Sequence, residues 1–113
     1  MAILGLAFKP GTEETAGSAG LWLLETLRAA GFAVFVHDPA VRLTEAGNVR
    51  QAAEATDCIA SAGLVVIATP WREYRNLDAQ VFEHKRVIDC WDMLSDSQKN
   101  ACESYRAMGA GPC

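Results

Sequence analysis

The stretch best suited to chemistry is a glycine-bearing loop near the start of the chain. It reads GLAFKPGT over residues 5–12, follows an apolar run and leads into a helical pattern. A helix N-terminus offers unpaired N–H groups and partial positive charge, which suit a phosphate. The loop matches neither the G-x-G-x-x-G fingerprint nor the phosphate-loop pattern in which the lysine follows the second glycine. Lys9 is therefore either a phosphate ligand or a surface lysine in a turn shaped by Pro10 and Gly11.

Three polar residues elsewhere could also serve a site. Asp38 ends the second apolar run, where dinucleotide-binding folds place a ribose-binding carboxylate, but the following Pro39 favours a turn-forming aspartate. His37 has no nucleophile, base or second ligand near it in the sequence, which predicts a structural role. His84, next to two basic residues, is predicted to be a solvated turn residue.

Aromatic residues follow the third and fourth apolar runs. Trp71 and Trp91 could stack on a base or ribose, or they could cover a surface that contacts another domain, and the sequence leaves both open. Trp22 lies inside the first helical pattern and is interpreted as a packing residue.

No catalytic set is present in the sequence. It has no G-x-S-x-G elbow, no paired-histidine metal motif and no cysteine with an evident activating base. Its cysteines form neither a C-x-x-C pair nor a zinc-ligand spacing, so they are interpreted as structural or incidental thiols without disulfides. These are Cys58, Cys90, Cys102 and Cys113.

Length and composition indicate one globular unit. The chain has 113 residues, of which 50% are hydrophobic, and a formal net charge of -4. Residues 1–113 are predicted to form a single domain. The absence of a basic face argues against nucleic acid, and no apolar run approaches the roughly 20 residues of a membrane helix. The apolar opening lacks the basic start of a signal peptide, so a cytoplasmic protein is expected.

Apolar runs alternate with helical patterns along the chain. The near-continuous runs suit strands of a parallel sheet covered on both faces; they span residues 2–7, 33–37, 64–68 and 86–89, with a weaker fifth at 105–108. Helices are predicted at 15–30, 48–61 and 95–104, with short turns at 72–74 and 79–83. Gly31 is expected to end the first helix, and Val49, Ala52, Ala53 and Ile59 to line the second. This order predicts a Rossmann-like, doubly wound, mostly parallel sheet of about five strands with helices on both faces.

The motifs resemble the UDP-binding domain of the UDP-glucose/GDP-mannose dehydrogenase family. The run LGLAFKPGTEET at 4–15 resembles its opening G-L-A-F-K-P-G-T-D-D, and HDP at 37–39 resembles its Y-D-P. Further along, IATPWREY at 67–74 is similar to A-T-x-W-x-E-F/Y, and VID at 87–89 to the strand before D-G-R. Residues 105–109 resemble the closing strand, so the resemblance covers nearly the whole chain.

The resemblance implies a function for the complete protein and for this part of it. Family members oxidise the 6-hydroxymethyl group of a nucleotide sugar with two NAD, using an N-terminal NAD-binding domain and a central catalytic cysteine. The C-terminal domain holds the nucleotide. Phe8 and Lys9 would then line the cleft, with Lys9 facing the diphosphate, and Trp91 completes the predicted substrate-binding set. No catalytic residue is carried over. The expected partners are UDP or a UDP-sugar and the remaining domains, with no cofactor bound by this domain alone.

Two departures from the family pattern affect the nucleotide. Ala16 stands where the family has the arginine of R-x-S-P, and Trp91 where it has the arginine of D-G-R. Neither provides a guanidinium fork. Losing a charge-assisted hydrogen bond costs about 1.5–3 kcal/mol, so two losses would weaken binding by about two orders of magnitude or more.

Three hypotheses follow. The chain is a nucleotide-binding piece of a dehydrogenase that is inert alone, or a binding or scaffold module that acts through protein contacts. The third hypothesis, an independent small enzyme, is supported only by the predicted fold, because an open α/β sheet binds ligands beyond the carboxyl ends of its strands.

Overall fold

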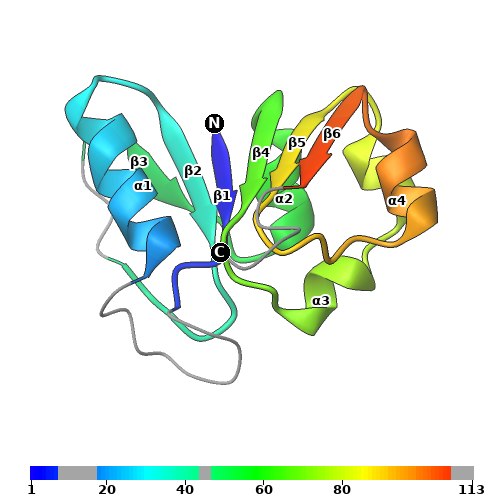
Figure 1. Cartoon of the computed structure of the whole chain (residues 1–113). Coiled ribbons are helices and arrows are strands. Elements are labelled where there is room, and N and C mark those ends of the chain that lie inside the picture. Colours follow the sequence, from blue (N-terminus) through cyan, green and yellow to red (C-terminus); the bar gives the residue numbers. More distant parts are fainter. Residues whose placement is uncertain (8–17, 44–46, 108–113) are drawn as a thin grey trace.

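The computed structural model describes residues 1–7, 18–43 and 47–107, which build a parallel sheet (Figure 1). Its six strands are β1 (Ala2–Leu4), β2 (Val34–His37), β3 (Val49–Gln51), β4 (Leu64–Ile67), β5 (Arg86–Asp89) and β6 (Ser104–Ala107). Their order in the sheet is β3-β2-β1-β4-β5-β6, and every neighbouring pair is parallel. The predicted α/β, Rossmann-like class is confirmed.

Short helices connect the strands and lie on both faces of the sheet. They are α1 (Ala19–Ala29), α2 (Ala55–Ala60), α3 (Arg72–Arg75), the 3-10 helix η1 (Ala79–Phe82) and α4 (Asp96–Ala101). In Figure 1, α1 lies in front of the half that contains β1, β2 and β3, while α2 lies behind the sheet. We call these sides the α1 face and the α2 face.

Alternation along the strands divides the buried residues into two cores. Ala2 and Leu4 of β1 pack on the α2 face with α2, whereas Ile3 between them packs on the α1 face with Leu24. Successive side chains of a strand point to opposite faces, so these near-continuous apolar runs supply both cores, as a parallel sheet requires.

The helix predicted over residues 48–61 is wrong in its first half. Val49–Gln51 forms β3 and pairs in parallel with β2, and the helix begins only at Ala55. Val49 and Ile59 are buried as expected, but Ala53 is exposed. Pairing along the edge of β2 outweighs the local helix propensity of the alanine-rich stretch. The sheet therefore has six strands in the described residues, where about five were expected.

The helix α1 starts and ends on identifiable residues. Ser18 caps it by accepting a hydrogen bond from the Leu21 N–H at 3.2 Å. Gly31, just beyond the end, has φ +91°, a left-handed conformation that suits glycine, and its N–H bonds to the Arg28 carbonyl. Trp22 is 69% exposed, so the interpretation of this tryptophan as a packing residue is wrong.

Candidate functional site: the carboxyl edge of the sheet

Strand order reverses between β1 and β4, where an open α/β sheet places its ligands. The chain leaves β1 through Gly5, which has φ +102°. A Cβ at this position would lie 2.5 Å from the Thr69 backbone nitrogen, which follows β4. Gly20 of α1 is equally tight, because a Cβ there would lie 2.0 Å from the Gly5 carbonyl oxygen. Two glycines thus let the first turn of α1 and both strand ends meet at the reversal point.

Asp38, at the end of β2, binds the loops around this point together. Its Oδ2 accepts hydrogen bonds from the N–H groups of Leu6 (2.7 Å) and Ala7 (2.9 Å) and from Nε1 of Trp71 (3.0 Å). Its Oδ1 accepts from two N–H groups of its own loop, those of Ala40 (2.7 Å) and Val41 (3.0 Å). The side chain is 4% exposed. Five protein donors use the acceptor capacity of one carboxylate.

This arrangement decides between the two interpretations of Asp38. The bonds to residues 40 and 41 are those of a turn-forming aspartate, as Pro39 indicated. A ribose hydroxyl would have to displace one of the existing donors. Thr69 adds a second fastening, since its Oγ1 donates to the Ala7 carbonyl at 2.7 Å. The segment that leads into residues 8–17 is therefore held at Leu6 and Ala7.

His37 lies beneath this edge and has a structural role, as predicted. It is 3% exposed, and its Nδ1 lies 3.0 Å from the Tyr74 hydroxyl oxygen. That hydroxyl donates to the His37 carbonyl (3.2 Å), so a proton on Nδ1 completes the pair. Burial lowers the pKa of His37, although Glu73, with its carboxylate 3.8 Å from Nε2, acts in the opposite direction. The imidazole is therefore neutral near pH 7.

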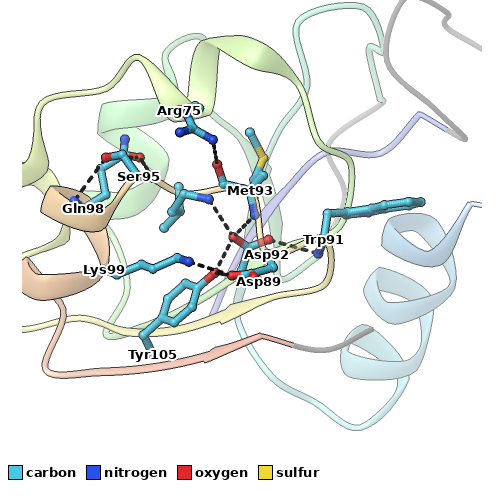
Figure 2. Close-up of polar contacts among 10 residues, drawn as sticks. Arg75, Asp89, Trp91, Asp92, Met93, Ser95, Gln98, Lys99 and Tyr105 are labelled. Atoms are coloured by element: carbon cyan, nitrogen blue, oxygen red, sulfur yellow. Dashed lines mark hydrogen bonds and ion pairs between the residues drawn. The ribbon is translucent and has the colours of Figure 1, made fainter. Parts of the chain in front are cut away.

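The loop after β5 is built around a second buried carboxylate, Asp89 (Figure 2). Its Oδ1 accepts from the Trp91 N–H at 3.0 Å, and its Oδ2 accepts from the N–H groups of Met93 (2.7 Å) and Leu94 (3.0 Å). The Tyr105 hydroxyl of β6 also lies 2.8 Å from Oδ2. Asp89 is fully buried. The conformation of the loop that carries Trp91 is thus set by one side chain.

A surface cluster extends this network from β6 to α4. The Tyr105 hydroxyl lies 2.9 Å from Oδ1 of Asp92, and Nζ of Lys99 lies 2.8 Å from the same oxygen. Burial and the carboxylates of Asp89 and Asp92 raise the pKa of Tyr105 well above its usual range. The hydrogen bonds from Lys99 and Tyr105 lower the pKa of Asp92. Tyr105 therefore stays protonated and serves as a donor.

Trp91 is the predicted substrate-binding residue whose position is described. Its ring points away from the Asp89 network in Figure 2, is 50% exposed, and donates from Nε1 to the Ala68 carbonyl at 3.0 Å. With its N–H already bonded, the indole has mainly its faces to offer, which suits stacking. Phe8, Lys9 and Ala16 lie outside the described residues. Trp71 differs from Trp91: it is half-buried, bonded to Asp38, and packs against both cores.

Positive charge at this edge comes from exposed side chains. Arg42 follows Asp38 in the loop after β2, and Arg72 begins α3 after β4. The sequence interpretation assigned neither a role. In the described residues, no group of histidine, cysteine or acidic side chains could hold a metal ion.

The cysteines within the described residues form no disulfide. Cys58 is buried, and burial raises its pKa to about 12, so it is not a nucleophile. Cys102 also has a raised pKa for the same reason. Cys113 lies outside the described residues. His84 is exposed, as predicted. No helix among the described residues is long and apolar enough to cross a membrane.

Comparison with known proteins gives consistent results. The model of the "UDP-glucose/GDP-mannose dehydrogenase family, UDP binding domain" matches residues 2–96. The UDP-glucose 6-dehydrogenase AglM of Haloferax volcanii is 39% identical over 98 residues, which are 79% of this chain and 22% of that protein. The UDP-glucose 6-dehydrogenase of Pseudomonas aeruginosa is 34% identical over 92 residues, 71% of this chain and 20% of that protein.

A solved structure shows the same likeness. A UDP-glucose dehydrogenase from Pyrobaculum islandicum superimposes with a TM-score of 0.76 at 28% identity, covering 93% of this chain and 24% of that chain. The chain therefore spans about a fifth to a quarter of the relatives that it matches.

Proposed function

We propose that this chain, which belongs to the UDP-glucose/GDP-mannose dehydrogenase family as its UDP-binding domain, holds the nucleotide half of a UDP-sugar and has no turnover alone. The observation that carries the proposal is the fastening of Leu6 and Ala7 by Asp38. These residues directly precede Phe8 and Lys9 at the point where strand order reverses. A fixed approach to the loop lowers the conformational entropy lost when the loop closes on a ligand.

In this proposal three residues contact different parts of the UDP-sugar. Lys9 places its ammonium group against the diphosphate, and Phe8 lines the same side of the cleft. Trp91 presents an indole face to the base or ribose. Its exposed ring and its rigid loop support this role, because a stacking platform has to be fixed before the ligand arrives.

The affinity of this chain for UDP is expected to be lower than that of family members that carry both arginines. Ala16 and Trp91 replace two arginines, which removes two fork-shaped donors for phosphate. Arg42, on the loop after β2, and Arg72, at the start of α3, carry exposed guanidinium groups. They add positive charge near the edge, but they do not occupy the positions of the two family arginines.

The chain itself does not fit NAD. It lacks G-x-G-x-x-G, and Asp38, at the position where such folds bind a ribose hydroxyl, is already bonded to five protein donors. Oxidation with NAD is therefore proposed only for a complete dehydrogenase, whose remaining parts would supply the cofactor site and the catalytic cysteine. A cytoplasmic location stays a prediction of the sequence.

Titration calorimetry with UDP tests the role of Lys9. Lys9→Ala is expected to lower the affinity by about tenfold or more, since it removes a charge-assisted contact worth about 1.5–3 kcal/mol. Arg28→Ala is the matched control: it also removes one positive charge, but near the far end of α1, where Arg28 pairs with Glu25. Equal affinities for both variants would remove Lys9 from the site.

A second function, a scaffold module that acts through protein contacts, is favoured by one observation. Trp22 is a large apolar side chain that is 69% exposed and lines an apolar hollow together with Leu64 and Ile88, and a contiguous exposed apolar patch is typical of a contact surface. The two functions differ in their response to ligand. Binding of UDP at 100 times its dissociation constant should stabilise the fold by about 2.7 kcal/mol, whereas a scaffold module without a nucleotide site would show no stabilisation at millimolar UDP.

A further inference from the structure

One half of the α1 face has no described helix over it. The strands β4, β5 and β6 point Leu64, Val66, Ile88, Ser104 and Arg106 to this side, and we call this surface the open sheet face. Their neighbours Val65 and Val87 point the other way and are buried beneath the α2 face. Figure 1 shows α1 over the other half of the sheet, which contains β1, β2 and β3.

The open sheet face is hollowed and apolar. Two hollows of about 320 and 290 Å³ lie on it, and both are lined by Leu64 and Ile88, so they form one continuous trough. Trp22 and Leu23 of α1 form the wall on the β1 side. The exposure of Trp22 thus belongs to the same surface as the trough.

The dimensions of the trough suit one helix. Adjacent strands lie about 4.8 Å apart, so three strands span about 10 Å, which is close to the 10–12 Å diameter of a helix with its side chains. Parallel sheets are normally covered on both faces by helices. A helix placed beside α1 would cover β4 to β6 and complete the layer.

Basic residues lie on only one side of the trough in the described part of the chain. Its far side, along β5 and β6, carries the exposed side chains of Arg86 and Arg106, and Arg86 is paired with Glu103 at 3.0 Å. Arg106 has no ion pair among the described residues, so its guanidinium at the rim is available to an acidic partner. The occupant would need an apolar stripe with acidic residues on the side that faces β6.

We propose that the open sheet face is the docking site for an amphipathic helix of this kind, supplied by the part of the dehydrogenase that lies outside this domain. The proposal rests on the proposed function. The relatives, of which this chain spans only about a fifth to a quarter, contain enough further chain to supply the helix. Burial of the stripe against Leu64, Val66 and Ile88 would stabilise the contact.

Thiol labelling in two contexts tests the proposal. Leu64→Cys and Ile88→Cys are prepared in the isolated chain and in a chimera, in which this chain replaces the matching segment of the Pseudomonas aeruginosa enzyme. Phe32→Cys is the matched control, because Phe32 is an apolar residue, 51% exposed, that lines neither hollow. Maleimide modification is followed at each position by mass spectrometry.

The expected result is fast labelling at all three positions in the isolated chain. In the chimera, labelling at positions 64 and 88 should slow by about tenfold or more, because the thiols then react only after local opening, while position 32 is unchanged. Photo-cross-links from position 64 should reach residues spaced three or four apart, the spacing of a helix face.

Other outcomes would overturn the proposal. Equal labelling at the three positions in the chimera would mean that nothing docks there. Slow labelling at positions 64 and 88 already in the isolated chain would mean that the face is covered there. If dilution restores fast labelling, the occupant is a second copy of the chain. If labelling stays slow on dilution, the occupant is another segment of the same chain. Affinity for UDP, measured on the same proteins, separates this proposal from the proposed function. Leu64 starts β4 at the end remote from the carboxyl edge, so Leu64→Cys is expected to leave UDP binding unchanged whatever docks. Ile88 directly precedes Asp89 at that edge, so Ile88→Cys is used for the labelling measurement alone.

Discussion

Asp38 and Asp89 are two buried carboxylates at the same edge of the sheet, and they organise it differently. Asp38 accepts bonds from residues 31 to 33 positions away along the chain as well as from its own turn, so it couples the loops after β1, β2 and β4. Asp89 accepts from three N–H groups of the loop that follows it, those of residues 91, 93 and 94, and from one tyrosine of β6. The first connects loops across the point of strand reversal, and the second shapes one loop.

The comparison indicates where nucleotide recognition has to come from. Both carboxylates have the position of a ligand-binding group, since each lies at the end of a strand at the carboxyl edge. Each is instead satisfied by protein donors and buried. Binding in the proposed site therefore depends on the side chains that these networks hold in place, which are Trp91 in one loop and Phe8 and Lys9 beyond the other.

The largest effect is expected from Asp38→Asn. The amide can keep one oxygen toward Leu6, Ala7 and Trp71, but its NH₂ then faces two N–H donors, those of Ala40 and Val41. Two lost charge-assisted bonds should lower the free energy of unfolding by about 3 kcal/mol. Urea denaturation measures this loss, and hydrogen exchange should show faster exchange at Leu6 and Ala7. Asp57→Asn, at an exposed helix position, is the control and should change stability by less than about 0.5 kcal/mol.

A smaller effect is expected from Asp89→Asn. Here the amide can keep its oxygen toward Met93, Leu94 and Tyr105 and set its NH₂ against a single donor, the Trp91 N–H. The expected loss is about 1–2 kcal/mol in the same urea measurement, with faster exchange confined to the loop after β5. If Asp89→Asn also accelerated exchange at Leu6 and Ala7, the distinction between the two networks would be wrong.

The smallest expected effect is the loss of stability at acidic pH that results from protonation of His37. Burial places the pKa of folded His37 below its ordinary value of 6.5, so the folded state binds fewer protons than the unfolded state as pH falls. The stabilisation is complete above pH 6.5 and is lost as pH falls through the folded pKa. The free energy of unfolding should thus decrease below pH 6.5, and His37→Gln should remove that slope. His84→Gln, at an exposed histidine, should retain it, and a slope that disappeared instead in His84→Gln would contradict this assignment.

Much of the fold could be predicted from local sequence. Apolar runs marked five of the strands, and Gly31 marked the end of α1, because these signals act within a few residues. The strand β3 was missed because three residues, Val49–Gln51, followed by alanines carry no strand signal of their own, and pairing with β2 decides their conformation.

The site was harder to predict than the fold. Asp38 could be recognised as a turn former from Pro39, but its bonds to Leu6 and Ala7 connect residues 31 and 32 positions apart and exist only once β1 and β2 are neighbours. The contact of Tyr105 with Asp89 has the same origin. Trp22 was misinterpreted because helix position alone does not tell which part of the sheet a helix covers.

The most direct test of the account is a titration of the ¹⁵N-labelled chain with UDP, followed by amide and indole N–H chemical shifts. The account predicts that the largest changes gather at the carboxyl edge, at Leu6, Ala7 and the indole of Trp91, and that Leu64 and Ser104, at the opposite ends of their strands, change little. Saturable changes centred on Leu64 and Ser104, or none at all at millimolar UDP, would contradict the claim that this edge receives the nucleotide.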